Sequence, residues 1–433
     1  MRIGRTLPPA AAPIYLRDII SGIKGLFQGK RELERFETEL KEYFGVKYCF
    51  LVSSGKAALT LILTALREMY PERHEVLIPA FTCYSVPSAI VRAGLKIRLC
   101  DIDASTLDFD FDQMATILSQ FISTAQNKSN ENSSASSNAI LESSEPSSRL
   151  LAIIPTHLFG LSADLERVRK LVDGYRVVIV EDAAQAFGGE CNGKKLGTLG
   201  DVNFFSLGRG KSFTTVEGGI ILTNREDIAG AIGRIKRSIP GYKINESLKL
   251  ILHAIALAFF VHPRLFWFPK LFPFLKLGET IYDPNFEIRT MSFFQAGMTR
   301  GWQRNLTRIK KIRAGNARQC LDLIRATRND ELIPMSCKPN SDQIYANLIR
   351  FPLRTIDAST REKILEESDR KGLGIMGTYP DAINGIEELK NEFLEKPFLM
   401  AKEQADSLIT FPVHPFVTQK DWAEIASLIS KLH

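Results

Sequence analysis

The sequence predicts an α/β protein with a large, doubly wound domain and a smaller α+β domain after it. Strand-like runs alternate with helical patterns through most of the chain, which is typical of a largely parallel sheet. The pattern changes near residue 315. The 433 residues, 45% hydrophobic and 24% charged, are enough to bury a large core and form more than one domain. We therefore predict a large domain over residues 1–314 and a small C-terminal domain over residues 315–433.

Seven apolar runs predict a mostly parallel, seven-stranded sheet in the large domain. Ligands of such sheets gather beyond the carboxyl ends of the strands, so polar side chains at those ends are candidates for a site. Ser54, Asp182 and Ser206 all fall there. The seven runs cover residues 49–52, 76–78, 97–100, 151–154, 177–180, 202–205 and 219–222.

The C-terminal part predicts fewer elements in a different order. A helical pattern over residues 314–325 precedes strand-like runs near 344–350 and 407–411. An amphipathic helix over residues 422–431 follows. This arrangement predicts a smaller α+β domain.

Two segments interrupt the pattern. Residues 123–148 are rich in Ser, Asn, Ala and Glu without an apolar period, and predict a flexible, solvated insertion. Residues 248–277 form an apolar insertion, but prolines divide it into runs shorter than the roughly 20 residues that span a bilayer. Three interpretations of it stay open: a helical insertion packed on the large domain or across a dimer, a membrane-surface contact, and a wall of the substrate site.

The most informative motif is a strand that ends in a carboxylate, followed by a Ser-x4-Lys loop. Asp182 follows the run 177–180, and the loop runs from Ser206 to Lys211. Each residue alone has an ordinary structural explanation, but their order favours pyridoxal phosphate chemistry. The lysine amine would attach the cofactor, the carboxylate would keep its pyridine nitrogen protonated, and the serine would bind its phosphate.

A third element lies upstream, where the first strand meets a helix-forming run at Ser54-Gly55-Lys56. The free amides of a helix N-terminus bind anions, and a glycine lets the backbone approach them closely. An ordinary serine N-cap is the alternative explanation. The spacing is not that of a Walker loop. The turn is therefore a second candidate for the phosphate site.

Taken in order, these motifs resemble those of the DegT/DnrJ family of fold-type I aminotransferases, many of which act on nucleotide-linked keto sugars. The resemblance implies the fold-type I architecture, pyridoxal 5'-phosphate as cofactor, and a homodimer in which residues 289–296 lie against the neighbouring subunit's cofactor. The motifs that carry it lie at residues 54–59, 78–82, 101–103, 157–160, 181–185, 197–201, 206–211, 217–219, 289–296 and 411–414.

The resemblance also implies a role for each matching residue. Lys211 is expected to attach the cofactor and act as the base for the proton shift, with its pKa lowered by burial beside a cation. Asp182 is expected to pair with the pyridine nitrogen, and Gln185 to contact the phenolic oxygen of the ring. Ser206, with the backbone of residues 55–56, is expected to form the phosphate cup.

Three departures from the family pattern affect these expectations. The family's threonine after Ser-Gly is replaced by Lys56, which would either add a charge at the phosphate or point to solvent. The family's aromatic residue that stacks on the cofactor ring is replaced by Cys83, and Tyr84 is the next candidate to cover the ring. The family's asparagine that reaches the neighbouring subunit's phosphate is replaced by Glu287. A carboxylate is a poor phosphate ligand, so Asn285 or Arg289 is expected to take that place.

The function predicted from these observations is transfer of an amino group from an amino acid, glutamate or glutamine, to a keto sugar carried on a nucleotide. A pyridoxal- or pyridoxamine-phosphate-dependent sugar dehydratase is the alternative in the same fold. Lys211 argues against it, because the resemblance implies histidine at that position in those enzymes. A membrane-associated protein that binds the cofactor without turnover is the alternative from another class.

Charge and cysteine content suggest partners and location. The net charge of +7 favours anionic partners such as sugar nucleotides, phosphates or acidic lipid. No motif indicates nucleic-acid binding. The six cysteines form no CxxC pair or His/Cys cluster, which predicts reduced thiols and no metal site. The basic N-terminus does not predict a signal peptide. We expect a cytoplasmic protein, peripheral at a membrane if residues 248–277 contact one.

Overall fold

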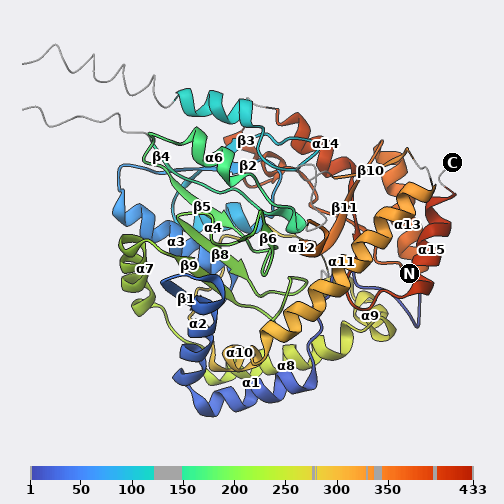
Figure 1. Cartoon of the computed structure of the whole chain (residues 1–433), viewed down its shortest axis with the longest axis horizontal. Coiled ribbons are helices and arrows are strands. Elements are labelled where there is room, and N and C mark those ends of the chain that lie inside the picture. The colour runs from blue at the N-terminus through green and yellow to red at the C-terminus, as the bar shows by residue number, and fades with distance from the viewer. Residues whose placement is uncertain are drawn as a thin grey trace, which may run out of the picture.

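The computed structural model describes residues 2–120, 149–275, 278, 280–327, 330–335, 344–393 and 397–431. The insertion predicted at residues 123–148 lies outside the described residues. The described chain contains a seven-stranded sheet, a four-stranded sheet and a two-stranded hairpin (Figure 1). The predicted fold class, a large and mostly parallel α/β sheet, is confirmed.

The large sheet has the strand order β1-β9-β8-β5-β4-β2-β3. Strand β9 is antiparallel to both of its neighbours, and every other neighbouring pair is parallel. All seven predicted runs form strands of this sheet. They are β1 (Tyr48–Val52), β2 (Glu75–Pro79), β3 (Lys96–Cys100), β4 (Leu150–Ile153), β5 (Val178–Asp182), β8 (Val202–Ser206) and β9 (Gly219–Thr223).

Helices cover both faces of this sheet, as the central strand β5 shows. Val178 and Val180 belong to the core cluster under α3, whereas Ile179 belongs to the cluster under α6. All five residues of β5 are buried, which is expected for a parallel strand covered on both faces. The covering helices include α2 (Lys30–Phe44), α3 (Gly55–Met69), α4 (Ser85–Arg92), α6 (Leu165–Leu171) and α7 (Glu226–Ser238).

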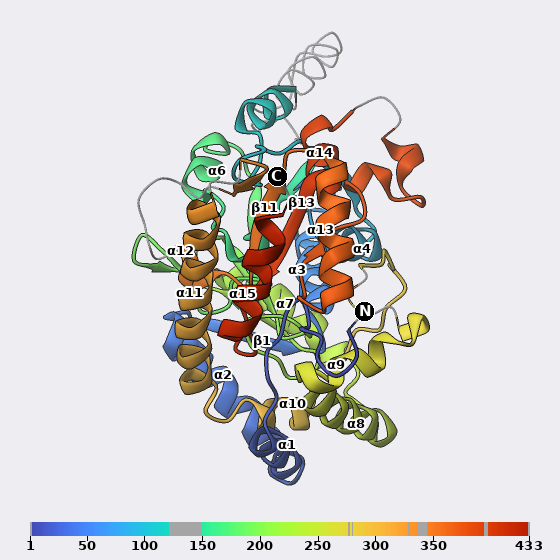
Figure 2. The same cartoon turned by 90° about the vertical axis from the view of Figure 1, so that its right-hand side faces the viewer.

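The second sheet is antiparallel, with the order β10-β11-β13-β12. Its strands are β10 (Leu332–Pro334), β11 (Arg350–Thr355), β12 (Met376–Gly377) and β13 (Leu408–Pro412). The helices beside it are α11 (Trp302–Thr327), α13 (Ala358–Lys371), α14 (Leu399–Ser407) and α15 (Gln419–Ile429). The predicted domain boundary at residue 314 falls inside α11, one continuous helix that joins the two parts (Figure 2).

One predicted strand of the small domain was wrong in part. The run near 344–350 forms the short helix α12 (Ile344–Asn347), and strand β11 begins at Arg350. Asn347 is held against β6 (Glu190–Cys191), the first strand of the hairpin with β7 (Lys194–Lys195). Its Oδ1 accepts from the Glu190 amide at 3.1 Å, and its Nδ2 donates to the Glu190 carbonyl at 2.8 Å. These long-range hydrogen bonds override the local strand preference.

The N-terminal residues run along the small domain before the first helix. Leu7 N donates to the Gly372 carbonyl at 2.9 Å, and Arg5 forms an ion pair with Asp421 of α15. Helix α1 (Leu16–Gln28) then packs closely on α10 (Phe293–Met298): a Cβ on Gly25 would lie 2.9 Å from the Gly297 Cα. The N-terminus therefore lies beside the C-terminal helices (Figure 2).

The apolar insertion forms helices α8 (Ile244–Phe260) and α9 (Pro263–Lys270), which are followed by the 3₁₀ turn η2 (Pro273–Leu275). Among the described residues, no single helix is long and apolar enough to span a membrane; α8 and α9 satisfy these criteria only as a pair, bent by 117°. Within α8 only Leu250 and Ala254 are buried, against α1 and α10. The insertion therefore packs on the large domain through a narrow stripe and leaves most of its apolar residues exposed.

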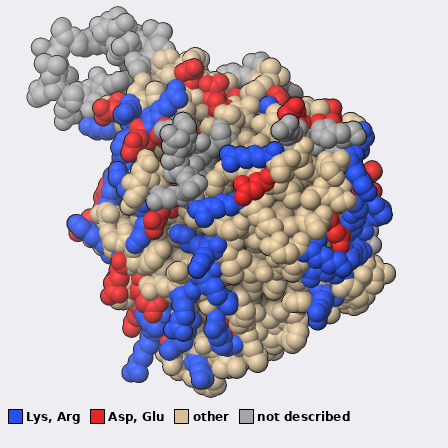
Figure 3. All heavy atoms as spheres, turned by 45° about the vertical axis from the view of Figure 1, so that its right-hand side comes forward, with Lys and Arg blue, Asp and Glu red and all other residues tan. Residues whose placement is uncertain are grey.

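The other 3₁₀ turns are η1 (Leu158–Gly160), η3 (Ile383–Gly385) and η4 (Lys390–Glu392). On the face shown in Figure 3, Lys and Arg side chains gather in clusters around a broad neutral region.

Candidate active site

Asp182 ends β5 at the carboxyl edge of the large sheet. Its Oδ1 accepts a hydrogen bond from the Ala184 amide at 2.9 Å, and its carbonyl accepts from the His157 amide at 3.0 Å. Burial raises the pKa of Asp182, while the Ala184 amide and the charges of Lys211 and His157 act in the opposite direction. A buried carboxylate with one amide partner is well suited to pair with a cation.

Lys211 lies in the loop that joins β8 to β9. Burial lowers the pKa of Lys211, and the charge of Arg350 lowers it further, while Cys83 and Asp182 oppose these effects. A lowered pKa favours the neutral amine, which is the nucleophilic and basic form. A lowered pKa of Lys211 was expected from the family resemblance, whereas the contribution of Arg350 was not.

Arg313 of α11 holds the Lys211 loop in place. Its Nη2 donates to the carbonyls of Lys211 and Ala11, both at 3.0 Å, and its Nη1 donates to the Ser212 carbonyl at 3.3 Å. The side chain is buried. Sequence reasoning missed Arg313, because a basic residue in a helix gives no signal that it points inward.

The N-terminus of α3 and the end of β8 meet at Gly55 and Ser206. Ser54 caps α3, with its Oγ accepting from the Ala57 amide at 3.1 Å. A Cβ on Gly55 would lie 2.8 Å from the Ser206 Cβ, so only glycine allows this approach. The Ser206 hydroxyl thus lies against a helix N-terminus, which is an arrangement suited to a phosphate. The Lys56 Nζ lies 3.8 Å from Asp283 Oδ2.

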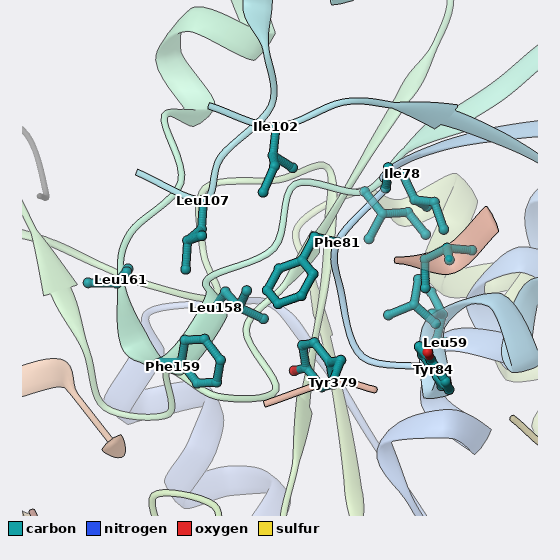
Figure 4. Close-up of a cluster of buried hydrophobic side chains, with 14 of the residues drawn as sticks. Leu59, Ile78, Phe81, Tyr84, Ile102, Leu107, Leu158, Phe159, Leu161 and Tyr379 are labelled. Carbon is teal, nitrogen blue, oxygen red and sulfur yellow. The ribbon is translucent and has the colours of Figure 1, made fainter. Parts of the chain in front are cut away.

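Gln185 lies near the same edge and is held by two hydrogen bonds. Its Oε1 accepts from the Phe159 amide at 3.1 Å, and its Nε2 donates to the Tyr379 hydroxyl at 3.1 Å. Tyr379 packs against Phe81 and Phe159 (Figure 4), with ring centroids 5.3 and 6.3 Å away. The amide of Gln185 is therefore fixed in orientation.

Cys83 and Tyr84 differ in where the structure places them. Cys83 lines the cavity that contains Lys211, and among the described residues Tyr84 is not part of that lining. The Tyr84 hydroxyl is hydrogen-bonded to the amide and the carbonyl of Asp381, each at 3.0 Å, and its ring lies in the core beside Leu59 (Figure 4). The structure therefore does not bring Tyr84 to the site, because backbone groups of the small domain hold it.

Arg289 also lies outside the described lining of this cavity. Its guanidinium forms ion pairs with Glu246 of α8 and with Glu287, both at 2.6 Å. Asn285 is exposed. Within one chain, then, neither candidate for the family's phosphate-reaching residue lies at the phosphate end.

The buried side chains of His157 and Glu181 form a pair at the end of β5, next to Asp182. His157 Nε2 lies 2.8 Å from Glu181 Oε1, and His157 Nδ1 accepts from the Ala163 amide at 3.0 Å. Glu181 also accepts from the amides of Gly197 at 2.5 Å and Gly200 at 2.9 Å. Sequence reasoning did not assign Glu181 a role; here it ties the end of β5 to the turn before β8.

Seven of the nine predicted site residues line one cavity of about 940 Å³. It brings together a lysine amine, a buried carboxylate, and a helix N-terminus with a serine hydroxyl. These groups fit pyridoxal phosphate, because each could hold a different part of it. The predicted site residues that line the cavity are Ser54, Gly55, Lys56, Asp182, Gln185, Ser206 and Lys211.

The apolar insertion forms the rest of the cavity lining. Helices α8 and α9 and the residues around η2 contribute aromatic and aliphatic side chains. The insertion thus packs on the large domain, as the first interpretation expected, and it borders the cavity that contains Lys211. Its contact with a membrane surface and its role as a wall of the substrate site stay predictions. The sequence did not determine that the insertion lies beside Lys211.

Comparison with known proteins agrees with this geometry. A model of the DegT/DnrJ/EryC1/StrS aminotransferase family matches residues 20–430. The chain is 30% identical over 222 residues to GDP-perosamine synthase of Vibrio cholerae, covering 51% of this chain and 52% of that protein. It is 28% identical over 207 residues to GDP-4-keto-6-deoxy-D-mannose 3-dehydratase of Yersinia pseudotuberculosis, covering 47% and 46%. These matches span about half the length of the curated relatives.

A solved structure resembles the whole fold. The aminotransferase PseC of Helicobacter pylori, described as involved in the biosynthesis of pseudoaminic acid, superposes with a TM-score of 0.72 over 99% of both chains, at 18% identity. At this identity the likeness concerns the fold, and it agrees with the predicted fold-type I architecture.

Proposed function

The chain belongs to the DegT/DnrJ/EryC1/StrS aminotransferase family, and on that premise we propose that it is a pyridoxal-phosphate-dependent aminotransferase. The donor is an amino acid such as glutamate, and the acceptor is a keto sugar. The observation that carries the proposal is the joint position of Lys211 and Asp182 in one cavity with the N-terminus of α3.

Different residues hold different parts of the cofactor. The backbone at Gly55 and Lys56, with the Ser206 hydroxyl, binds the phosphate. Asp182 pairs with the pyridine nitrogen, which neutralises a carboxylate that burial otherwise disfavours. Gln185, already fixed by Phe159 and Tyr379, lies beside the ring. When bound, the cofactor supplies the electron-withdrawing ring that makes the adjacent substrate carbon acidic.

Lys211 attaches the cofactor and then moves the proton. Because burial favours its neutral amine, Lys211 can take a proton from the donor's α-carbon and return it to C4′ of the cofactor. The second half of the reaction reverses these steps on the acceptor. The presence of Lys211 weighs against the dehydratase alternative, although one of the relatives carries that activity in its name.

We also propose a cytoplasmic homodimer with composite sites. Arg289 does not reach the cavity of its own chain, yet it follows a segment with partly buried apolar residues, Phe286 and Ile288. A two-fold interface is the commonest way to place such a segment against a second site. Arg289 would then supply a cation to the partner's phosphate.

An absorbance experiment tests the function directly. Purified protein should carry the absorption of a lysine-bound pyridoxal phosphate, and addition of glutamate or glutamine should convert it to the pyridoxamine form with release of the keto acid. A spectrum that does not respond to any amino acid would leave only the alternative of a binding protein without turnover. A soluble keto-sugar nucleotide added to the converted enzyme should restore the first spectrum if that acceptor class is correct.

A further inference from the structure

The cavity has two chemically different halves. The inner half contains Lys211, Asp182, Ser206 and the N-terminus of α3, all of them polar groups held by the large sheet. The outer half is the lining contributed by α8, α9 and the residues around η2. Its members include Leu257, Phe260, Phe266, Phe268, Phe272 and Leu275.

Several apolar side chains of the outer half are exposed to solvent. Its exposed members range from 36% for Phe260 to 51% for Ile281, whereas Leu257 and Phe266 are partly buried. The rings form a contiguous series, with Phe260 and Phe268 stacked at 5.9 Å and Phe268 against Phe272 at 5.3 Å. A contiguous apolar wall open to solvent is rare on a soluble protein unless it binds something apolar.

Within the residues that the structure describes, the outer half also lacks lysine and arginine, which could pair with the phosphates of a nucleotide. Among its described lining residues, only His253 and Thr280 are polar. A nucleotide carrier brings a diphosphate and a base that need cations and hydrogen-bonding partners. An alkyl or prenyl chain needs only apolar surface, and each buried methylene favours binding.

Cations lie elsewhere in the same cavity. Arg209 and Lys56 belong to its lining, and Arg209 is exposed and forms no ion pair within the described part of the chain. A phosphate next to the sugar could pair with Arg209. The lining therefore suits a molecule with a polar head, a phosphate and an apolar tail.

We propose that the acceptor is a keto sugar joined through phosphate to a long apolar chain, and that the outer half binds this chain. The proposal rests on the proposed aminotransferase function, with the sugar directed to Lys211 in the inner half. It assigns the apolar insertion a role in substrate selection.

Alkyl glucosides test the apolar site without knowledge of the sugar. A series from hexyl to dodecyl glucoside, kept below the micellar concentration, is titrated into the cofactor-loaded protein by calorimetry. We expect affinity to increase with each methylene, by up to about fourfold for one that is fully buried. Free glucose and a nucleoside diphosphate are titrated in parallel.

A double variant in the outer half and a matched control variant test where the alkyl chain of the glucosides binds. Phe260→Ser combined with Phe268→Ser should flatten the dependence on chain length, because both rings line the outer half. Phe259→Ser is the control: its residue neighbours Phe260, is 59% exposed and is not among the described lining residues. Circular dichroism confirms that all variants are folded.

Each outcome decides the proposal. Flattening in the double variant but not in Phe259→Ser supports it. An equal response of both variants indicates general adsorption on the exposed helices, and overturns it. Tight nucleoside-diphosphate binding without chain-length dependence indicates a nucleotide carrier, and also overturns it. A dimer that dissociates in the double variant, with no glucoside binding in the native protein, shows that a second copy covers the wall instead.

The glutamate reaction separates this test from that of the proposed function. It uses the inner half alone and needs no acceptor. If glutamate fails to convert the cofactor, the aminotransferase proposal falls. If glutamate converts it but the glucosides show no dependence on chain length, only the apolar acceptor is refuted.

Discussion

The two halves of the cavity are built in opposite ways. In the inner half, Asp182 and Gln185 are held by hydrogen bonds to backbone or to buried side chains on a rigid sheet edge. In the outer half, Phe260 stacks on Phe268, which also packs against Phe272, on a helical insertion with few buried residues. Reactive groups need a fixed scaffold to hold them in position, whereas an apolar group can be selected by an apolar surface alone.

The largest expected effect is at Lys211. Lys211→Ala should lower transamination by about 10³-fold or more, because it removes both the attachment point and the base. Borohydride reduction followed by peptide mass spectrometry should find the cofactor on Lys211 in the native protein. Lys56→Ala is the matched control, since Lys56 lines the same cavity; a label on Lys56 would refute the assignment.

Replacement of Asp182 should have the next largest effect. Asp182→Asn keeps the acceptor for the Ala184 amide but cannot hold a proton on the pyridine nitrogen. We expect a decrease in kcat of about 10²–10³-fold, with an unchanged circular dichroism spectrum. Turnover equal to that of the native protein would show that this carboxylate is only structural.

Subunit mixing tests whether the inner half is complete within one chain. Lys211→Ala and Arg289→Ala subunits, each inactive alone, should regain up to about a quarter of native activity after exchange, because half of the dimers are mixed and each has one intact site. Exchange is verified with differently tagged subunits. A monomer by light scattering, or no recovery after proven exchange, would place the whole site in one chain.

The smallest expected effect concerns stability without cofactor. The pKa of Asp182 is raised in the folded protein, so its charge destabilises the apo-protein at pH values above that raised pKa. Apo Asp182→Asn should therefore be more stable than the native apo-protein at neutral pH. The difference should shrink as the pH falls toward 3.8, the ordinary pKa of an aspartate side chain. Urea unfolding across this range measures it, and a difference independent of pH would contradict the assigned cause.

Many residues of the inner half could be predicted from the sequence, because they follow strands in a recognisable order. Asp182, Ser206 and Lys211 lie within one stretch of chain, and the strand that precedes each loop has a clear apolar pattern. The residues that hold these side chains in place could not be predicted from the sequence. Arg313 reaches the Lys211 loop from a helix about a hundred residues later, and nothing in its local sequence indicates burial.

Tyr84 and Asn347 show the same limit in detail. Tyr84 is adjacent to the position that lines the cavity, but Asp381 of the small domain holds its hydroxyl. Asn347 lies in a short helix where a strand was predicted, and its side chain is hydrogen-bonded to the Glu190 backbone. In both cases a distant backbone group sets the orientation, and such partners become known only when the chain is folded.

By itself the sequence determined the seven strands, the order of the cofactor motifs and the apolar character of residues 248–277, since periodicity and local residue types encode these features. Only the tertiary structure decided that α8 and α9 lie beside Lys211 and complete one cavity with it. The physical reason is that α8 docks through Leu250 and Ala254 against α1 and α10, and this packing between distant segments fixes where its exposed aromatic face points.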